Sequence, residues 1–126
     1  NDYQVDEWPS TPEGEIRQAE EVVLHYRTLF AHPQVQAITW WDFSDGAWLN
    51  APSGLLRRDF TRKPAYDELE KLIKGEWWLP PTRMTTDANG QIAVVGCLGD
   101  YRVTVGREQA AFTLPQAGDV ALSVSL

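Results

Sequence analysis

The stretch "AITWWDFSDGAW", residues 37–48, decides how this chain is expected to fold and what it can bind. It holds three of the six tryptophans of the chain, Trp40, Trp41 and Trp48, with two aspartates and a glycine among them. One interpretation is structural, a buried strand that runs into a loop. The other is functional, a flat aromatic surface for a flat ligand with carboxylates beside it. The residues of this stretch alone leave both open.

The residues before and within this stretch alternate as in a β-strand, from Val35 to Trp41. In that alternation Trp41 faces one side of the strand and Trp40 the other, so Trp40 is expected to pack against flanking helices. A loop follows from residue 42 to residue 63, and loops of that length are usually functional, disordered or misassigned. Trp48 lies within this loop.

Two helices are expected on either side of the strand and loop. The first runs from about Glu13 to Phe30, with Thr11 as its N-cap and Pro12 at its first position. Its apolar positions recur at helical spacing and its polar positions are expected to face water. The apolar set is Ile16, Ala19, Val22, Val23, Tyr26, Leu29 and Phe30, and the polar set is Glu15, Arg17, Gln18, Glu20 and Glu21.

The second helix is predicted from Pro64 to Lys74, because proline suits the first helical position and an apolar stripe follows. Gly75 then stands where a C-terminal cap is expected. The stripe consists of Tyr66, Leu69, Leu72 and Ile73.

Beyond Gly75 the pattern changes to short alternating runs separated by turn residues, which is typical of a small antiparallel β unit. The expected strands are 83–86, 91–95, 101–105, 110–114 and 120–126, and the segment "DANG" at 87–90 is expected to be a turn rather than a calcium loop. These features divide the chain into domains 1–78 and 79–126.

A helix, a strand, a long loop and a helix form the repeating unit of an α/β fold. One parallel strand cannot form a sheet, so residues 1–78 are expected to be a fragment of a larger architecture. The strand at 35–41 would then pair with the remainder of that fold, with a second copy of the chain, or with the β unit.

Composition excludes several classes of protein. Of the 126 residues 43% are apolar and 23% charged, as in soluble globular domains. The net charge of −7 argues against a nucleic-acid partner, and no apolar run approaches the roughly 18 residues of a membrane span. The basic residues between Arg57 and Lys63 are interrupted by Asp59 and are expected to form a solvated loop. The missing initial methionine suggests a processed or cut chain.

No cofactor or metal motif is present. The chain has no glycine-rich phosphate loop, no Gly-x-Ser-x-Gly elbow and no His/Cys ligand spacing. Cys97 stands alone in an apolar setting and is expected to be a buried, inert thiol. His25 and His32 are expected to be a packing residue and a helix-end residue.

The chain resembles glycoside hydrolase family 10, the endo-β-1,4-xylanases. The residues that carry the resemblance are "HPQVQAITWWDFSDGAW" at 32–48, "GLLRRDFTRKPAYDELEKLI" at 54–73, and "EWW" with "TTDANGQIAVVGCLGDYRVTV" in the tail. The resemblance implies an α/β fold, in which residues 1–78 are the last helices and eighth strand of a (β/α)8 TIM barrel and the rest is a β-rich extension. Asp42 departs from it, since many members carry a small residue there.

In that family, tryptophans at the places of Trp41 and Trp48 form the wall of a sugar subsite, and Asp45 belongs to the same stretch. Retaining glycoside hydrolysis needs two carboxyl groups about 5 Å apart. The resemblance puts both catalytic glutamates outside this chain, and Asp6 and Glu7 are poor substitutes in a proline-rich loop. The isolated chain is therefore expected to be inactive, with substrate-binding but no catalytic or metal-binding residues.

The resemblance implies a parent enzyme that cleaves β-1,4 bonds of xylan or a related glycan. Two alternatives stay open: a non-catalytic carbohydrate-binding module that uses the same tryptophans, or a structural fragment that needs its missing half. The expected partners are a β-1,4-linked polysaccharide or oligosaccharide and the remainder of the barrel or a second copy, with no nucleic acid and no membrane. Because the polymer lies outside cells, the parent is expected to be extracellular.

Overall fold

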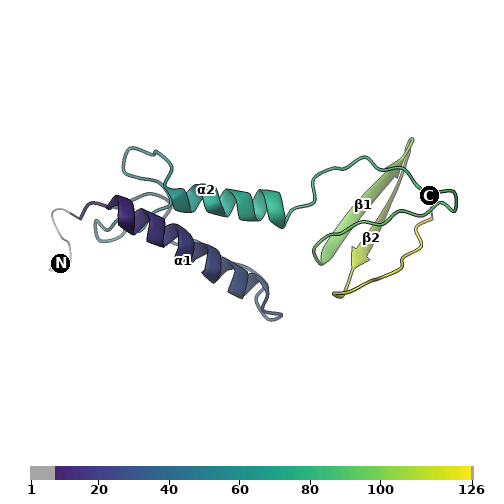
Figure 1. The fold of residues 1–126 in the computed structure, drawn as a ribbon, viewed down its shortest axis with the longest axis horizontal. Helices are drawn as coiled ribbons and strands as arrows, with labels where there is room; N and C mark the ends of the chain where they lie inside the picture. Colours follow the sequence, from purple (N-terminus) through teal and green to yellow (C-terminus); the bar gives the residue numbers. More distant parts are fainter. Residues whose placement is uncertain (1–7, 126) are drawn as a thin grey trace. The chain divides into compact units, whose positions relative to one another are not determined.

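The computed structural model describes residues 8–125, which contain two helices and a two-stranded antiparallel sheet (Figure 1). The elements are α1 (Pro12–Phe30), α2 (Pro64–Glu70), the π-helical segment η1 (Lys71–Glu76), β1 (Gly99–Val105) and β2 (Glu108–Leu114). The chain divides into two compact units between Glu76 and Trp77, two residues before the boundary expected from the sequence. Neither helix among the described residues is long and apolar enough to cross a membrane.

The start of α1 is where the sequence predicts it, because the capping signals are local. Thr11 has an extended backbone, and its Oγ1 accepts a hydrogen bond from the Gly14 backbone N at 3.1 Å. Pro12 follows at the first position, where its missing N–H costs nothing. Glu13 in the first turn and Arg27 in the last turn complement the helix dipole.

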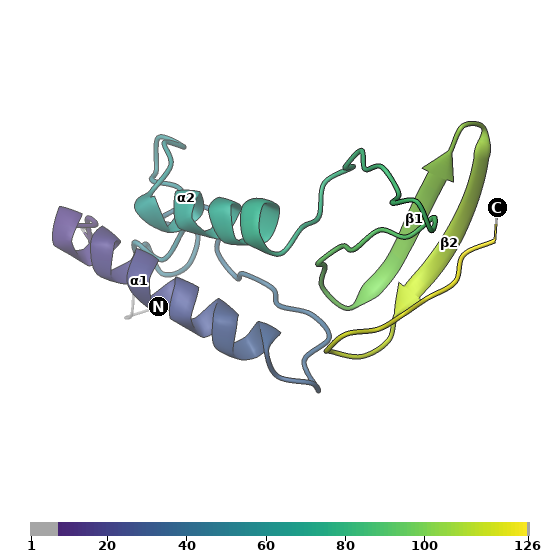
Figure 2. The same cartoon turned by 45° about the vertical axis from the view of Figure 1, so that its right-hand side comes forward.

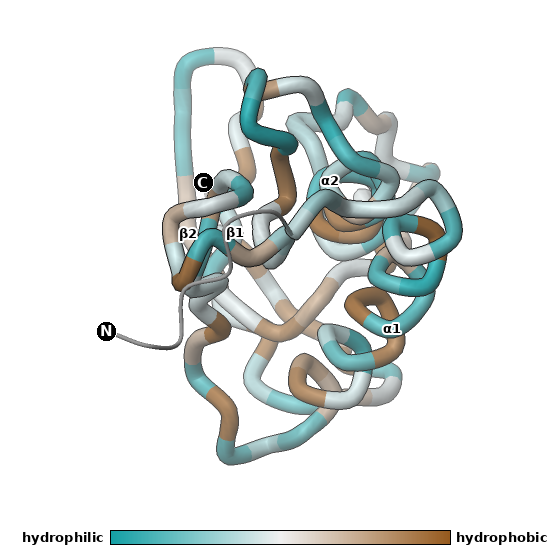
Figure 3. The backbone as a smooth tube through the Cα atoms, turned by 90° about the vertical axis from the view of Figure 1, so that its left-hand side faces the viewer, coloured by the Kyte–Doolittle hydropathy of each residue, from teal (hydrophilic) through white to brown (hydrophobic). Residues whose placement is uncertain are grey.

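The buried face of α1 differs in part from the prediction. Ala19, Val22 and Tyr26 are buried at helical spacing, as expected. Ile16 is 55% exposed, however, and Glu15, which was expected to face water, is only 6% exposed. The difference follows from a partner across the unit, Arg57, which neutralises the buried carboxylate. Figure 3 shows hydrophobic and hydrophilic stretches alternating along the helix.

The second helix lies alongside α1 in both ribbon views (Figures 1 and 2). Ala65, Leu69 and Leu72 are buried and complete the core that α1 begins. The predicted cap at Gly75 is wrong: the helix widens into η1, and Gly75 lies within that segment instead of ending it. The backbone of Gly75 is not left-handed, so it cannot form the usual glycine cap.

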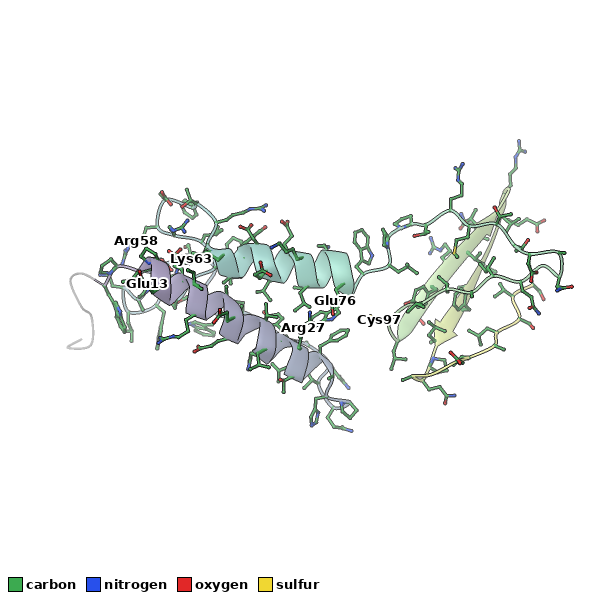
Figure 4. All side chains as sticks on the ribbon, in the orientation of Figure 1. Glu13, Arg27, Arg58, Lys63, Glu76 and Cys97 are labelled. Atoms are coloured by element: carbon green, nitrogen blue, oxygen red, sulfur yellow. The ribbon has the colours of Figure 1, made fainter. Side chains whose placement is uncertain are left out.

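An ion pair joins the end of η1 to α1. Two guanidinium nitrogens of Arg27 each lie 2.5 Å from a carboxylate oxygen of Glu76. Figure 4 shows the two side chains turned toward one another. The hydrogen bonds from Arg27 lower the pKa of Glu76 and outweigh its partial desolvation. Both side chains are about half exposed, so this pair contributes little to stability.

The strand predicted at residues 35–41 does not form. The segment has no ladder partner among the described residues, and β-structure needs a lateral partner for its N–H and C=O groups. The described residues include only two isolated bridges outside the hairpin, Ser44 with Leu56 and Leu56 with Arg62. The expectation that this segment would find a partner strand is therefore wrong for the structure of this chain.

The loop from 42 to 63 is nevertheless well organised by backbone hydrogen bonds. Asp45 N donates to Leu56 O at 2.9 Å, and Gly46 N donates to Ala51 O at 2.8 Å. Leu49 and Asn50 adopt left-handed backbone conformations, with φ of 49° and 61°, which turn the chain sharply. Ala51, Leu55 and Leu56 are buried and bring this loop into the core.

The second unit is built on one antiparallel hairpin. β1 and β2 pair from Gly99 with Leu114 to Val105 with Glu108. The rings of Tyr101 and Phe112, which are direct partners, stack with centroids 5.3 Å apart. The turn at 87–90 also forms, with Gly90 N donating to Asp87 O at 3.0 Å.

The strands predicted at 83–86, 91–95 and 120–126 are wrong for the part of them that the structure describes, which excludes residue 126. Residues 91–95 are exposed, so their alternation has no buried face to pack. Alternation alone does not make a strand where no neighbour supplies hydrogen bonds.

The predicted fold class, a TIM-barrel fragment, is also wrong. The described residues form a small domain with two helices and a two-stranded antiparallel sheet, and they hold no barrel strand. A barrel strand is stabilised by a parallel neighbour on each side, and none is supplied here.

Candidate ligand-binding site

A cavity of about 580 Å³ lies in the first unit beside α1. Its walls come from one turn of α1, the extended segment that follows, and the long loop. The lining residues are His25, Tyr26, Ile38, Thr39, Trp40, Trp41, Asp42, Trp48 and Ser53. The aromatic stretch at residues 37–48 therefore lines a concave site.

The structure brings Trp41 and Trp48 together in the wall of this cavity. Trp41 is 85% exposed and Trp48 is 52% exposed. Large aromatic side chains that remain this exposed beside a cavity are typical of ligand or partner contacts. Their indole surface is available to a ligand.

Trp40 also lines the cavity but is held more firmly. It is half-buried, and its ring lies 6.4 Å from that of Tyr26 on α1, as the alternation of side chains predicts. Its buried Nε1 has no hydrogen-bond partner among the described residues. An unpaired buried donor costs about 1–3 kcal/mol, so the packing of the indole has to offset it.

Asp42 is the acidic residue among those described in the lining, and no role was expected for it from the sequence. It is 7% exposed, and its Oδ2 accepts a hydrogen bond from Ser53 Oγ at 2.7 Å. The signal that could have identified it was its place directly after Trp41, at the end of the aromatic run.

Asp45, which was predicted to bind substrate, is not among the residues that line the cavity. Its Oδ1 accepts hydrogen bonds from Lys63 Nζ at 2.6 Å and from Gly54 N at 2.9 Å. The side chain is 5% exposed. The carboxylate thus holds the loop to the start of α2, and sugar binding by Asp45 stays a prediction.

The basic residues of the loop form only part of the solvated cluster that was expected, because Arg58 and Arg62 are exposed but Arg57 and Lys63 are paired within the unit. Lys63 is fully buried at the start of α2, where Figure 4 labels it, and its Nζ also donates to Pro52 O at 3.0 Å. Arg57 donates to both carboxylate oxygens of Glu15, at 2.9 and 2.5 Å. Opposite charges distant in sequence explain both placements.

The electrostatics of Glu15 follow from this pairing. Burial alone would raise the pKa of its carboxyl, but hydrogen bonds from Arg57 and from Ser10 Oγ, at 2.7 Å, outweigh burial. The pKa of Glu15 is therefore lowered. The same hydrogen bond raises the pKa of Arg57.

The other candidate residues are placed as follows. Asp6 and Glu7 lie outside the described residues. Within residues 8–125 no group of three or more His, Cys, Asp or Glu side chains is placed to hold a metal. Cys97 is half-buried rather than buried, and its Sγ donates to Trp77 O at 3.2 Å within the second unit.

Comparison with known proteins gives a relative whose name is that of an anti-sigma factor. No family model matches the chain. The chain is 29% identical over 114 residues to the anti-sigma-I factor RsgI6 of Acetivibrio thermocellus. That alignment covers 87% of this chain but only 15% of the length of the relative. This chain is therefore similar to one segment of a much longer protein.

The resemblance to glycoside hydrolase family 10 is corrected by these findings. The relative is an anti-sigma factor, which is a regulatory protein. The described residues have no barrel strand, which the xylanase interpretation requires.

Proposed function

We propose that this chain is the ligand-binding part of a regulatory protein similar to anti-sigma-I factors, and that its ligand is a β-1,4-linked oligosaccharide or polysaccharide. The observation that carries the proposal is the pair of exposed indoles, Trp41 and Trp48, in the wall of one cavity. Binding of the sugar would be the input signal of the regulator.

The chemistry of the cavity suits a sugar. Pyranose rings expose C–H groups that pack on the faces of indoles, while their hydroxyls need hydrogen-bond partners at the edge of the aromatic surface. The side chains of Asp42 and Ser53 supply such polar atoms in the same lining. A volume of about 580 Å³ is enough for one or two sugar units.

The length of the relative bears on which part of a longer protein would bind the sugar and which part would contact a sigma factor. The alignment covers 15% of that protein, so the part that would contact a sigma factor is proposed to lie elsewhere in a longer chain. A polysaccharide cannot cross a membrane unaided, so the segment described here is proposed to act outside the cell.

A protein surface is the second candidate occupant. Two exposed indoles also suit an interface with a further segment of a longer chain or a second copy of this one. Sedimentation of the chain with and without sugar separates a sugar site from an interface between copies. A ligand site leaves the chain monomeric, and an interface between copies gives a concentration-dependent dimer.

Tryptophan fluorescence titrations with cellohexaose and xylohexaose test the proposal. Binding of at least one sugar should shift the emission. Trp41→Ala and Trp48→Ala should each weaken the affinity for that sugar at least about tenfold, which is 1.4 kcal/mol of binding free energy. Trp8→Ala, at an exposed tryptophan outside the cavity, is the matched control and should bind normally. Absence of binding to both sugars, or equal loss in all three variants, would overturn the proposal.

A further inference from the structure

Of the carboxylates that the structure describes, one is buried and lines the cavity, that of Asp42, directly beside the aromatic wall. We propose that Asp42 makes the site selective for uncharged sugar units and excludes sugars that carry a carboxylate or sulfate. This inference rests on the proposed function and adds the chemical class of ligand that the site accepts.

The position of the carboxylate is determined by its neighbours. Ser53 Oγ donates to Asp42 Oδ2 at 2.7 Å, from the far part of the same loop. An ionised carboxylate accepts hydrogen bonds and donates none, and it has room for about four. Ser53 donates one of these hydrogen bonds. The Asp42 carboxylate can therefore accept further ones from the hydroxyl groups of a neutral sugar, which are donors.

No lysine or arginine among residues 8–125 lines the cavity to neutralise this charge. The basic residues of the loop make contacts elsewhere, and Arg62 pairs with Asp67 and Glu70. Lys63 holds Asp45 at 2.6 Å, and Arg57 holds Glu15 at 2.5 Å. Arg58 hydrogen-bonds Asn50 within the loop.

Within the described part of the chain, His25 is the one basic group in the lining, at the exposed rim on α1. Its imidazole lies at the solvent-exposed edge of the site, whereas the Asp42 carboxylate is buried in the wall. An anionic ligand would therefore meet an uncompensated negative charge in a partly dry site, where repulsion is stronger than in bulk water. A neutral ligand would instead receive charge-assisted hydrogen bonds.

A matched pair of ligands tests the inference at pH 8. Cellohexaose is compared with its counterpart in which each C6 alcohol is oxidised to a carboxylate, so that ring faces and linkages are the same. The wild-type chain should bind the neutral hexamer at least tenfold more tightly. Asp42→Asn, which keeps the shape of the side chain, should reduce this ratio to less than about threefold, mainly by improving binding of the acid.

Two controls separate charge from structure. Ser53→Ala removes the hydrogen bond but keeps the charge, so the preference for the neutral hexamer should persist. Raising the salt concentration should weaken the preference of the wild-type chain for the neutral hexamer. This test does not depend on the folding of a variant.

The outcomes are distinguishable. Equal binding of the two hexamers by the wild-type chain, or an unchanged ratio in Asp42→Asn, overturns the inference while the proposed sugar site stands. If the wild-type chain binds neither hexamer nor xylohexaose, both proposals fall. A preference that disappears in Asp42→Asn and persists in Ser53→Ala supports the inference.

Discussion

Lys63 Nζ lies 2.6 Å from Asp45 Oδ1, and both side chains are buried. This ion pair joins the middle of the loop to the residue directly before α2. The same Asp45 oxygen accepts from Gly54 N, and the same ammonium donates to Pro52 O. The loop at 42–63 is thus anchored from inside the unit, while its tryptophan, Trp48, remains accessible.

Lys63→Met is expected to destabilise the chain by about 3–5 kcal/mol, because it leaves the Asp45 carboxylate buried without its cation. The double variant Lys63→Met with Asp45→Asn should recover much of that loss, since neither charge remains. Urea unfolding followed by circular dichroism measures both. A single variant that costs less than about 1 kcal/mol would show that the pair does not organise the loop.

Gly54→Ala and Gly75→Ala are expected to have opposite effects. A Cβ at Gly54 would overlap the backbone of Ser44 and lie 2.5 Å from Asp45 N, so the loop must shift, at a cost of about 1–3 kcal/mol. A Cβ at Gly75 meets nothing within 4 Å and lies in a helical segment, where alanine should stabilise by about 0.5–1 kcal/mol. Thermal unfolding measures the change in stability of each variant relative to wild type. If both variants are stabilised, or both destabilised, the packing described for the loop is contradicted.

The Glu15–Arg57 pair predicts a pH dependence of stability. Because the folded state lowers the pKa of Glu15 below its ordinary 4.5, its contribution is fully present above that value. It is lost as the pH falls through the folded pKa, where the carboxyl becomes protonated. Urea unfolding between pH 7 and pH 3 should show wild type more stable than Glu15→Gln at neutral pH, with the gap closing in acid.

The matched control for that measurement is Glu20→Gln, at an exposed position of the same helix. Its stability should follow that of the wild type across the range. If the difference in the free energy of unfolding between wild type and Glu15→Gln stays constant down to pH 3, the pair does not make the stability depend on pH.

Gly96 and Tyr101 are expected to be coupled in the second unit. Tyr101 Oη donates to Cys97 O at 2.6 Å, and Tyr101→Phe should cost about 1 kcal/mol by removing this bond. Gly96→Ala would push a methyl group into the tyrosine hydroxyl. In the double variant that hydroxyl is gone, so the combined cost should be smaller than the sum of the single costs. Additive costs in chemical denaturation would mean that the two residues do not touch.

Several elements could be predicted because their signals are local. Thr11 and Pro12 mark the start of α1 within four residues, and Pro64 marks the start of α2. The β1–β2 hairpin lies where alternation and turn residues place it, at 101–105 and 110–114. Trp41 lies beside a cavity as expected, although the strand from which that position was inferred does not form.

The sequence by itself therefore determined the two helices, the hairpin and the aromatic stretch, since caps, prolines and turns act over a few residues. Only the tertiary structure decided which carboxylate faces the cavity. Asp42 and Asp45 are the same type of residue, three positions apart in one stretch. Lys63, 18 positions away from Asp45, pairs with Asp45, while Asp42 lines the cavity. Likewise the segment 35–41 has the pattern of a strand but no lateral partner. Both outcomes depend on groups distant along the chain, because burying a charge or a backbone amide requires a partner that local sequence does not specify.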